Sequence, residues 1–362
     1  MRRDIYLGPL GMYAARRQAA ADEVWGSLRL AGGWLDFTAL EIIERIGGNA
    51  RRRTTGLGDF FERDWGRRTI ELADMFEALR APRGRVAGLV LDRPRLMGIV
   101  NLTPDSFSDG GQFATKQAAI DHALRLAEEG AEIIDIGAES TRPGSDPVPL
   151  DEELLRLMPV LEGLAGKTQA LISVDTRKAE VMRRAAAAGI DMLNDTSALT
   201  HDPEALSSAA ESGLPIVLMH AQGDPKTMQE NPHYDDVLLD VFDYLEARVA
   251  ACESAGIPRA QIIVDPGLGF GKSLEHNLQL LSGVNLFHAL GVPILVGASR
   301  KRFIGTLTNV EKPHERIAGS IGAALAAAAQ GVQILRVHDV AATRQALTVW
   351  EAANCGAPPR TR

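Results

Sequence analysis

Eight short apolar runs, each followed by a longer amphipathic stretch, repeat along the chain from about residue 95 onward. The runs are rich in Ile, Leu and Val, as buried strands are, and span residues 96–101, 132–137, 170–175, 191–195, 215–220, 261–265, 293–299 and 333–339. The stretches predicted as helices are 115–130, 150–166, 177–189, 203–213, 235–256, 273–290, 314–331 and 341–354. Eight strand–helix units with parallel strands predict an α/β chain folded as a closed (β/α)8 TIM barrel. An open doubly wound sheet fits less well, because the first strand leads into NLTPDSFSDGG and not into a glycine-rich dinucleotide turn.

About 90 residues precede this repeating pattern and differ from it in texture. Residues 36–46 are predicted to be helical with Asp36 or Thr38 as the N-cap, and residues 69–80 are predicted to be helical from the spacing of their apolar side chains. Residues 85–92 are predicted to form a short hairpin strand. The extension contains no catalytic motif, which favours an accessory or interaction segment. We therefore expect a partly helical extension of unknown role at 1–92 and a barrel at 93–356.

The composition of the 362-residue chain is that of an ordinary globular protein, with 45% hydrophobic and 24% charged residues. A net charge of −8 argues against general nucleic-acid binding, which needs a basic face, but leaves room for a local anion site. The two cysteines, Cys252 and Cys355, have no zinc-type spacing and argue against a disulfide framework. Because no signal-peptide or membrane-spanning run is recognisable, we expect a cytoplasmic protein with no membrane or nucleic-acid partner.

Most of the predicted strands end in a polar residue, which is unusual for an apolar run. These positions are Asn101, Asp135, Asp175, Asn194 with Asp195, His220, Asp265, Ser299 running into Lys301, and Arg336 with His338. In a barrel the carboxyl ends of all strands meet at one mouth, where active sites are built. A single polar strand end has an ordinary explanation as a loop cap, but so many at the same end predict a functional site.

The residues expected at this mouth carry both signs of charge. Asp175 and Asp265 are inward carboxylates and Asn194 offers an amide. Buried carboxylates must be paired or accept hydrogen bonds, and a flat heterocycle with an aminopyrimidinone edge supplies matching N–H donors. Positive charge and donors for an anion come from Arg142, Lys301, Arg336 and His338. The sequence therefore predicts a small, planar, donor-rich ligand beside a phosphate group.

Three loops at the predicted mouth are rich in glycine or turn-forming residues. The segments 101–111 and 139–148 are long, and loops of this kind often act as lids that exclude water. The third, GLGFGKS at 267–273, is not a phosphate loop, because Pro266 stands where the motif needs its first glycine. Its glycines are expected to allow a close backbone approach. No HExxH zinc motif and no GxSxG nucleophile elbow occurs in the sequence.

Eight segments of the barrel region match one known family in the expected order: MGIVNLTPDSFSDGG, IIDIGAESTRPGS, ISVDTRK, LNDTSA, LMHAQGDPKTMQ, VDPGLGFGK, VGASRK and LRVHDV. Over about residues 95–354 the chain resembles the bacterial dihydropteroate synthases, a family of pterin-binding barrels. Its departures, Ala198 for a common glycine and Ala221 for a frequent methionine, concern positions without chemistry. The resemblance implies a Mg2+-dependent transferase of folate biosynthesis. Such an enzyme condenses 6-hydroxymethyl-7,8-dihydropterin pyrophosphate with 4-aminobenzoate and releases pyrophosphate.

The resemblance also implies a role for each matching residue. The pterin would be held by Asp175, Asn194, Asp265 and Lys301, in a pocket lined by Met219 and Gly297 and covered by the guanidinium of Arg336. The diphosphate would be held by Asn101, Thr141, Arg336 and His338, with Asn101 also a ligand of Mg2+. The aminobenzoate site, where sulfonamides would compete, would be shaped by Phe107, Arg142, Pro143, Phe270 and Lys301. The expected catalytic residues are Asp175, Asp265, Lys301 and Arg336.

Three other functions stay open at this point. A pterin-barrel methyltransferase that acts on methyltetrahydrofolate shares the Asp–Asn–Asp set but needs no diphosphate site. A non-catalytic pterin-binding paralogue would lack an anion-site residue, and none is missing. A bifunctional enzyme would need a pyrophosphokinase in the extension, which is short for one. The resemblance further implies a homodimer, and the Ala- and Gly-rich run at 318–331 allows close helix contact, although packing against the sheet explains it equally well.

Overall fold

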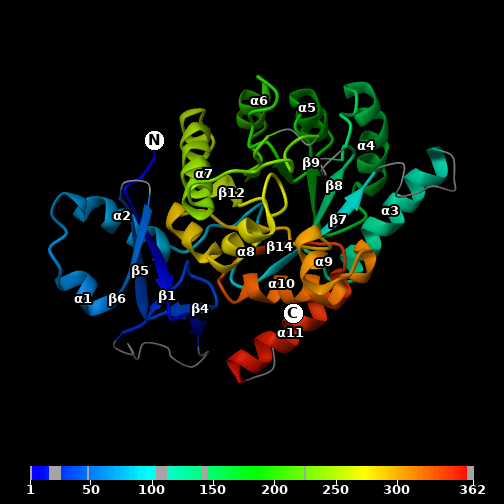
Figure 1. Ribbon diagram of the computed structural model, residues 1–362. Coiled ribbons are helices and arrows are strands. Elements are labelled where there is room, and N and C mark those ends of the chain that lie inside the picture. The colour runs from blue at the N-terminus through cyan, green and yellow to red at the C-terminus, as the bar shows by residue number, and fades with distance from the viewer. Residues whose placement is uncertain are drawn as a thin grey trace.

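The eight predicted strands form one parallel sheet that closes on itself. The structure, a computed structural model, describes residues 2–15, 26–46, 49–102, 112–140, 145–223 and 226–356. The strands are β7 (Arg95–Asn101), β8 (Ile133–Gly137), β9 (Leu171–Asp175), β10 (Met192–Asp195), β11 (Ile216–Met219), β12 (Ile262–Asp265), β13 (Leu295–Val296) and β14 (Ile334–Val337). Their order is β12-β11-β10-β9-β8-β7-β14-β13, and a parallel bridge between Val264 and Ile294 joins the two ends. The predicted (β/α)8 barrel is confirmed (Figure 1).

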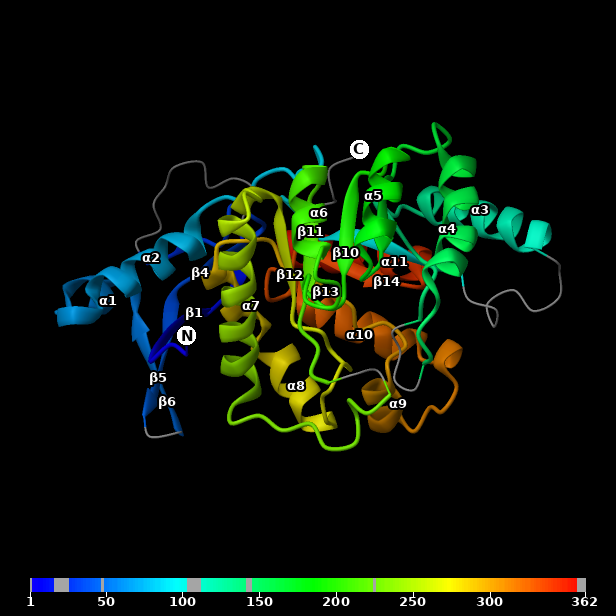
Figure 2. The same cartoon turned by 90° about the horizontal axis from the view of Figure 1, so that it is seen from above.

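Helices follow the strands in the predicted order and surround the sheet (Figures 1 and 2). They are α3 (Gln112–Glu128), α4 (Leu150–Leu164), α5 (Ala179–Ala187), α6 (Ala205–Ser212), α7 (Val237–Ser254), α8 (Leu274–Ser282), α10 (Ile317–Ala328) and α11 (Val340–Cys355). The predicted helix at 273–290 is divided at Gly283 into α8 and the 3-10 helix η4 (Val284–Leu290). A Cβ at position 283 would lie 2.7 Å from Leu238, so the packing requires glycine there, and glycine disfavours a continuous helix. A short helix that we did not predict, α9 (Arg302–Thr308), follows β13. Among the described residues no helix is both long and apolar enough to cross a bilayer.

An apolar layer closes the amino-terminal end of the barrel interior. Each strand contributes one side chain to it: Met97, Ile133, Leu171, Met192, Val217, Ile263, Leu295 and Ile334. Val86 and Leu91 pack against this layer from below. The hairpin strand predicted at 85–92 is therefore present only as a single antiparallel bridge between Val86 and Leu89, and its apolar residues plug the barrel floor.

The extension is mainly a small β-structure. Its larger sheet has the order β1-β5-β6 and is antiparallel, with β1 (Ile5–Leu10), β5 (Ala39–Ile46) and β6 (Asn49–Gly56). A second sheet has the order β2-β4-β3, with β2 (Tyr13–Ala14), β4 (Leu35–Phe37) and β3 (Leu28–Arg29). Two helices and a 3-10 turn complete it: α1 (Leu57–Glu62), η1 (Gly66–Arg68) and α2 (Thr69–Arg80). The predicted helix at 69–80 is confirmed.

The predicted helix at 36–46 is wrong, because these residues form β4 and β5. Leu40 and Ile43 have the three-residue spacing of a helix face, yet in the strand they point to opposite sides, and both are fully buried. β5 pairs with β1 on one edge and β6 on the other, so tertiary pairing overrides the local helical pattern.

The extension packs on one side of the barrel, against α7 and η4. Both views place the blue strands next to α7 and away from α3 and α4 (Figures 1 and 2). β1 and α2 contact η4, and the Trp34 indole N–H donates to the Ala328 carbonyl at 3.1 Å. Fully buried side chains of the extension, such as Phe37 and Ile42, belong to the same apolar core as Phe287 of η4. The extension is therefore joined to the barrel by a shared core.

Candidate active site

A layer of polar side chains lies directly above the apolar floor of the barrel. Because side chains alternate along a strand, the inward positions two residues beyond the floor are Ile99, Asp135, Ser173, Asn194, Met219, Asp265, Gly297 and Arg336. The next inward positions include Asn101, Asp175 and His338. The strand pattern therefore brings together, at the carboxyl-terminal end of the barrel interior, the strand-borne residues that we predicted for the site.

Asp135 is the centre of this polar layer, although it was not among the predicted site residues. Its side chain is fully buried and accepts hydrogen bonds from Ser173 Oγ at 2.6 Å and from Asn194 Nδ2 at 3.0 Å. Its second oxygen also pairs with Arg336 Nε at 2.7 Å. The available signal was an aspartate in the middle of the apolar run IIDIG, which we noted as a polar strand end without assigning it a role.

Arg336 links Asp135 to Asp175. Arg336 Nη2 donates to Asp175 Oδ2 at 2.9 Å, while Asp175 Oδ1 is buried with no hydrogen-bond partner in the described part of the chain. Burial raises the pKa of Asp175 to about 7; the Arg336 charge opposes this and the Asp135 carboxylate adds to it. Buried polar atoms are nearly always paired, so Asp175 Oδ1 is an acceptor suited to a ligand donor.

Asp265 and Lys301 form the opposite wall of the cavity. Asp265 Oδ1 accepts the Gly267 N–H at 2.7 Å, and Met219, its register partner on β11, is also buried. Burial raises the pKa of Asp265, against the opposing charge of Lys301. Lys301 Nζ donates to the Leu268 carbonyl and lies 4.6 Å from the centre of the Phe270 ring. Burial lowers the pKa of Lys301 to about 8, and the Asp265 carboxylate opposes this shift.

The glycine-rich loop after β12 is fixed by side chains on several sides. A Cβ at Gly267 would lie 1.9 Å from the His220 carbonyl oxygen, and one at Gly271 would lie 2.4 Å from the Gln222 carbonyl oxygen. The expected close backbone approach is therefore confirmed. The carbonyl of Phe270 accepts from Lys272 Nζ at 2.9 Å, and Lys272 also contacts His220 Nδ1 at 2.9 Å. Sequence reasoning gave Lys272 no role, because only the fold shows that this lysine turns inward.

The predicted anion-binding residues within the described ranges, Asn101, Arg336 and His338, lie at the end of the barrel near β7 and β14. His338 Nδ1 is 3.0 Å from Ser299 Oγ, and the His338 N–H donates to the same hydroxyl at 3.2 Å. Asn101 ends β7 and faces Gly137 of β8 in register. A Cβ at Gly297 would lie 3.7 Å from Arg336 Cβ, so this glycine adjoins the arginine stem. These contacts hold one imidazole and one guanidinium beside the carboxylate cavity.

The remaining predicted site residues, Phe107, Thr141, Arg142 and Pro143, lie outside the described residues. Within the described ranges, no three or more His, Cys, Asp or Glu side chains are grouped so that they could hold a metal ion.

Comparisons of the sequence and the fold with known proteins all point to one family. The sequence profile of a family described as "Pterin binding enzyme" matches residues 97–338. The dihydropteroate synthase of Escherichia coli (strain K12) is 51% identical over 264 residues, which cover 73% of this chain and 93% of that protein. A solved structure of Xanthomonas albilineans dihydropteroate synthase with 4-aminobenzoic acid has 55% identity and a TM-score of 0.70, covering 74% of this chain and 96% of the other. The Yersinia pestis dihydropteroate synthase, solved as a sulfonamide drug complex, has 48% identity and a TM-score of 0.70, covering 73% and 96%.

Proposed function

The chain belongs to the dihydropteroate synthases, within the pterin-binding enzymes, and from this premise we propose how the groups at its barrel mouth divide the work. It is a transferase of folate biosynthesis. It condenses 6-hydroxymethyl-7,8-dihydropterin pyrophosphate with 4-aminobenzoate to give 7,8-dihydropteroate and pyrophosphate. The observation that carries the assignment of roles is the buried pair of Asp175 and Arg336, in which one carboxylate oxygen remains without a partner.

The pterin ring lies in the polar layer of the barrel. Asp175, Asn194 and Asp265 accept its N–H donors, and Lys301 donates to a ring acceptor. Asp135 and Asp175 engage two nitrogens of the Arg336 guanidinium at 2.7 and 2.9 Å. This pairing fixes the plane of the guanidinium so that its flat face is available for stacking on the ring. Met219 and Gly297 line the remaining space.

The diphosphate lies toward the anion-binding residues Asn101, Thr141, Arg336 and His338. A Mg2+ ion fits there, because Mg2+ binds through one or two protein oxygens together with substrate phosphates and water, and the Asn101 amide supplies such an oxygen at the end of β7. When bound, the ion neutralises charge that develops on the departing diphosphate. Arg336 and His338 hold the same group from the protein side.

The aminobenzoate lies over the glycine-rich loop. Phe270 and Lys301, which contact each other at 4.6 Å, form its described wall. Phe107, Arg142 and Pro143 lie outside the described residues, and their part in this subsite stays a prediction from the sequence. Since the Yersinia pestis relative was solved as a sulfonamide drug complex, sulfonamides compete for this subsite here as well.

The reaction begins with cleavage of the carbon–oxygen bond to the diphosphate. The aromatic amine is already neutral and needs no general base before it attacks, so bond cleavage is the harder step. The carboxylates of Asp175 and Asp265 stabilise the pterin-methyl cation, because they are held in place before the charge develops. The loops at the mouth exclude water, which would otherwise trap the cation.

A substrate-pair assay tests this function. The chain is mixed with both substrates and Mg2+, and pyrophosphate release and dihydropteroate formation are followed together. We expect equal amounts of both products, and neither product when either substrate is left out. A pterin-barrel methyltransferase would release no pyrophosphate, and a non-catalytic paralogue would bind the pterin without forming product.

The functional unit is a homodimer. Small side chains recur at successive turns on the outer face of α10, at Ala318, Gly322 and Ala326, and all three are exposed in the single chain. Such a face allows close contact with a second helix. Sedimentation equilibrium tests this proposal, and a monomer at micromolar concentration would contradict it.

A further inference from the structure

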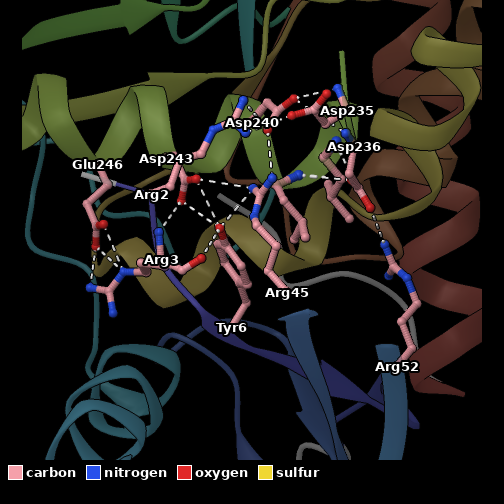
Figure 3. Close-up of polar contacts among 12 residues, drawn as sticks. Arg2, Arg3, Tyr6, Arg45, Arg52, Asp235, Asp236, Asp240, Asp243 and Glu246 are labelled. Carbon is pink, nitrogen blue, oxygen red and sulfur yellow. Dashed lines mark hydrogen bonds and ion pairs between the residues drawn. The ribbon is translucent and has the colours of Figure 1, made fainter. Parts of the chain in front are cut away.

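The seam between the extension and the barrel is lined by charges of opposite sign. Figure 3 shows four arginines of the extension facing a row of acidic side chains at the start of α7. The arginines are Arg2, Arg3, Arg45 and Arg52, and the acidic residues are Asp235, Asp236, Asp240, Asp243 and Glu246. The extension lies outside the residues that match the pterin-binding family, 97–338. The arginine side of this contact therefore lies outside the residues that the family profile matches, and the acidic side on α7 lies within them.

Arg45 is the most enclosed of these arginines. Its side chain is 10% exposed, and it pairs with Asp240 Oδ1 at 3.0 Å and with Asp243 Oδ2 at 3.2 Å. It also donates to the Tyr6 hydroxyl at 3.0 Å, and Tyr6 in turn donates to Asp243 at 2.8 Å. Removing one partner of a buried ion pair is costly, because the other charges are left without compensation. Arg45 thus fixes both aspartates of α7.

Asp240 connects Arg45 to residues 226–236, the segment that precedes α7. Its second oxygen accepts the Asp235 N–H at 2.9 Å, and Asp236 caps the helix by accepting the N–H groups of Leu238 and Leu239. The residue before Asp235 is Tyr234, whose hydroxyl donates to the Gly271 carbonyl at 2.8 Å. A chain of contacts therefore connects Arg45 to the glycine-rich loop. It runs from Arg45 to Asp240, from Asp240 to the Asp235 N–H, and through the neighbouring Tyr234 to the loop.

The same segment holds the loop at a second point. Gln229 Nε2 donates to the Gly269 carbonyl at 2.5 Å, so the carbonyls on both sides of Phe270 are bound by residues from 226–236. The Phe270 ring in turn contacts Lys301. The position of the Phe270 ring therefore depends on residues 226–236, and arginines of the extension form ion pairs at the end of this segment that leads into α7.

We propose that the extension is a brace for the aminobenzoate subsite and that Arg45 is a positioning residue for it. This inference rests on the proposed function, which places aminobenzoate against Phe270. The pterin-holding carboxylates project from β9 and β12, and within the described part of the chain their hydrogen bonds go to Arg336 and Gly267 and not to residues 226–236. Loosening the brace therefore weakens the use of aminobenzoate and leaves in place Asp175, Asn194 and Asp265, which accept from the pterin.

The test is a double-mutant cycle on the full chain. Arg45→Met removes the charge and keeps the side-chain length, and Tyr234→Phe removes the hydroxyl that holds Gly271. Each single variant should raise KM for 4-aminobenzoate by about three- to tenfold while KM for the pterin substrate stays within about twofold. Because both changes act on one path, the double variant should be no worse than the more affected single variant.

Arg29→Met is the matched control, since Arg29 pairs with Asp36 inside the extension at 2.6 Å and does not touch α7. It should leave both KM values unchanged. If Arg45→Met does not fold, Arg2→Met takes its place, because Arg2 is exposed and pairs with Asp235 at 2.7 Å. Additive effects in the cycle, or equal rises in both KM values, would overturn the brace. Absence of product from the unaltered chain would instead overturn the proposed function.

Discussion

The two oxygens of Asp175 have different surroundings, and this asymmetry bears on the chemistry. Oδ2 is paired with Arg336, whereas Oδ1 is buried and without a partner among the described residues. A buried oxygen without a hydrogen-bond partner interacts strongly with positive charge that develops beside it, because no water molecule or hydrogen bond has to rearrange first. Asp175 therefore favours the cationic transition state over the neutral ground state of the pterin.

Asp175→Asn should accordingly lower kcat more than pterin affinity. The amide keeps the shape of the carboxylate but loses its charge, so we expect kcat to fall by about two orders of magnitude while the Kd of the pterin substrate changes by under about tenfold. Titration calorimetry and steady-state kinetics on the same preparation give the two numbers. Asp195→Asn is a matched control, because Asp195 is buried on β10 and, among the described residues, its carboxylate accepts hydrogen bonds from Ser197 and Leu199 of its own turn. Equal losses of kcat and affinity in Asp175→Asn would argue against cation stabilisation.

The raised pKa of Asp175 also predicts a pH dependence. Only the ionised carboxylate stabilises a cation, and burial raises its pKa to about 7, so kcat/KM should rise by about tenfold per pH unit below that value and level off above it. Asp175→Asn should lack this acid limb. An acid limb near the ordinary carboxylate value of 3.8 would contradict the assignment.

Among the structural elements, the glycine-rich loop after β12 connects the pterin and aminobenzoate walls. Gly271 has a φ of +63°, and a Cβ there would meet the Gln222 carbonyl oxygen at 2.4 Å. Both the backbone conformation and the close contact require glycine.

Gly271→Ala should therefore displace the loop. We expect the free energy of unfolding to fall by about 1–3 kcal/mol. We also expect kcat/KM to fall more for aminobenzoate than for the pterin substrate. Thermal unfolding and kinetics with each substrate varied in turn measure both effects. Gly58→Ala in α1 is the control, because nothing lies within 4 Å of its added Cβ and alanine favours a helix. A Gly271→Ala variant as active and stable as the unaltered chain would show that the loop adapts freely.

The elements themselves were largely predictable from the sequence. Strand runs such as EIIDIG and QIIVD and the helix at 69–80 are found where the pattern placed them. The failure at 36–46 has a definite cause, because Leu40 and Ile43 fit a helix by spacing and a strand by pairing, and only contact with β1 and β6 decides between them. The break at Gly283 depends on Leu238 of another helix and is invisible locally.

For the whole molecule, the alternation of strand residues predicted which side chains share the cavity but not how they pair. Asp175, Asn194, Asp265 and Arg336 meet as expected, because inward positions recur every second residue. Arg336 pairs with Asp135 across 201 residues of chain, and no local pattern encodes that choice. The charged seam of the extension was missed for the same reason, since Arg45 and Asp240 are 195 residues apart.

The claim that the cavity promotes bond cleavage before the amine arrives can be tested directly by isotope scrambling. The pterin diphosphate is labelled with 18O at the oxygen that joins the pterin methylene carbon to the first phosphorus. It is incubated with the chain and Mg2+ without aminobenzoate and is then recovered unreacted. We expect the label to appear in non-bridging positions of the recovered diphosphate, and to do so far more slowly with Asp175→Asn. A label that stays wholly in the bridge, while the same preparation forms dihydropteroate once aminobenzoate is added, would show that the carboxylates do not stabilise a free cation.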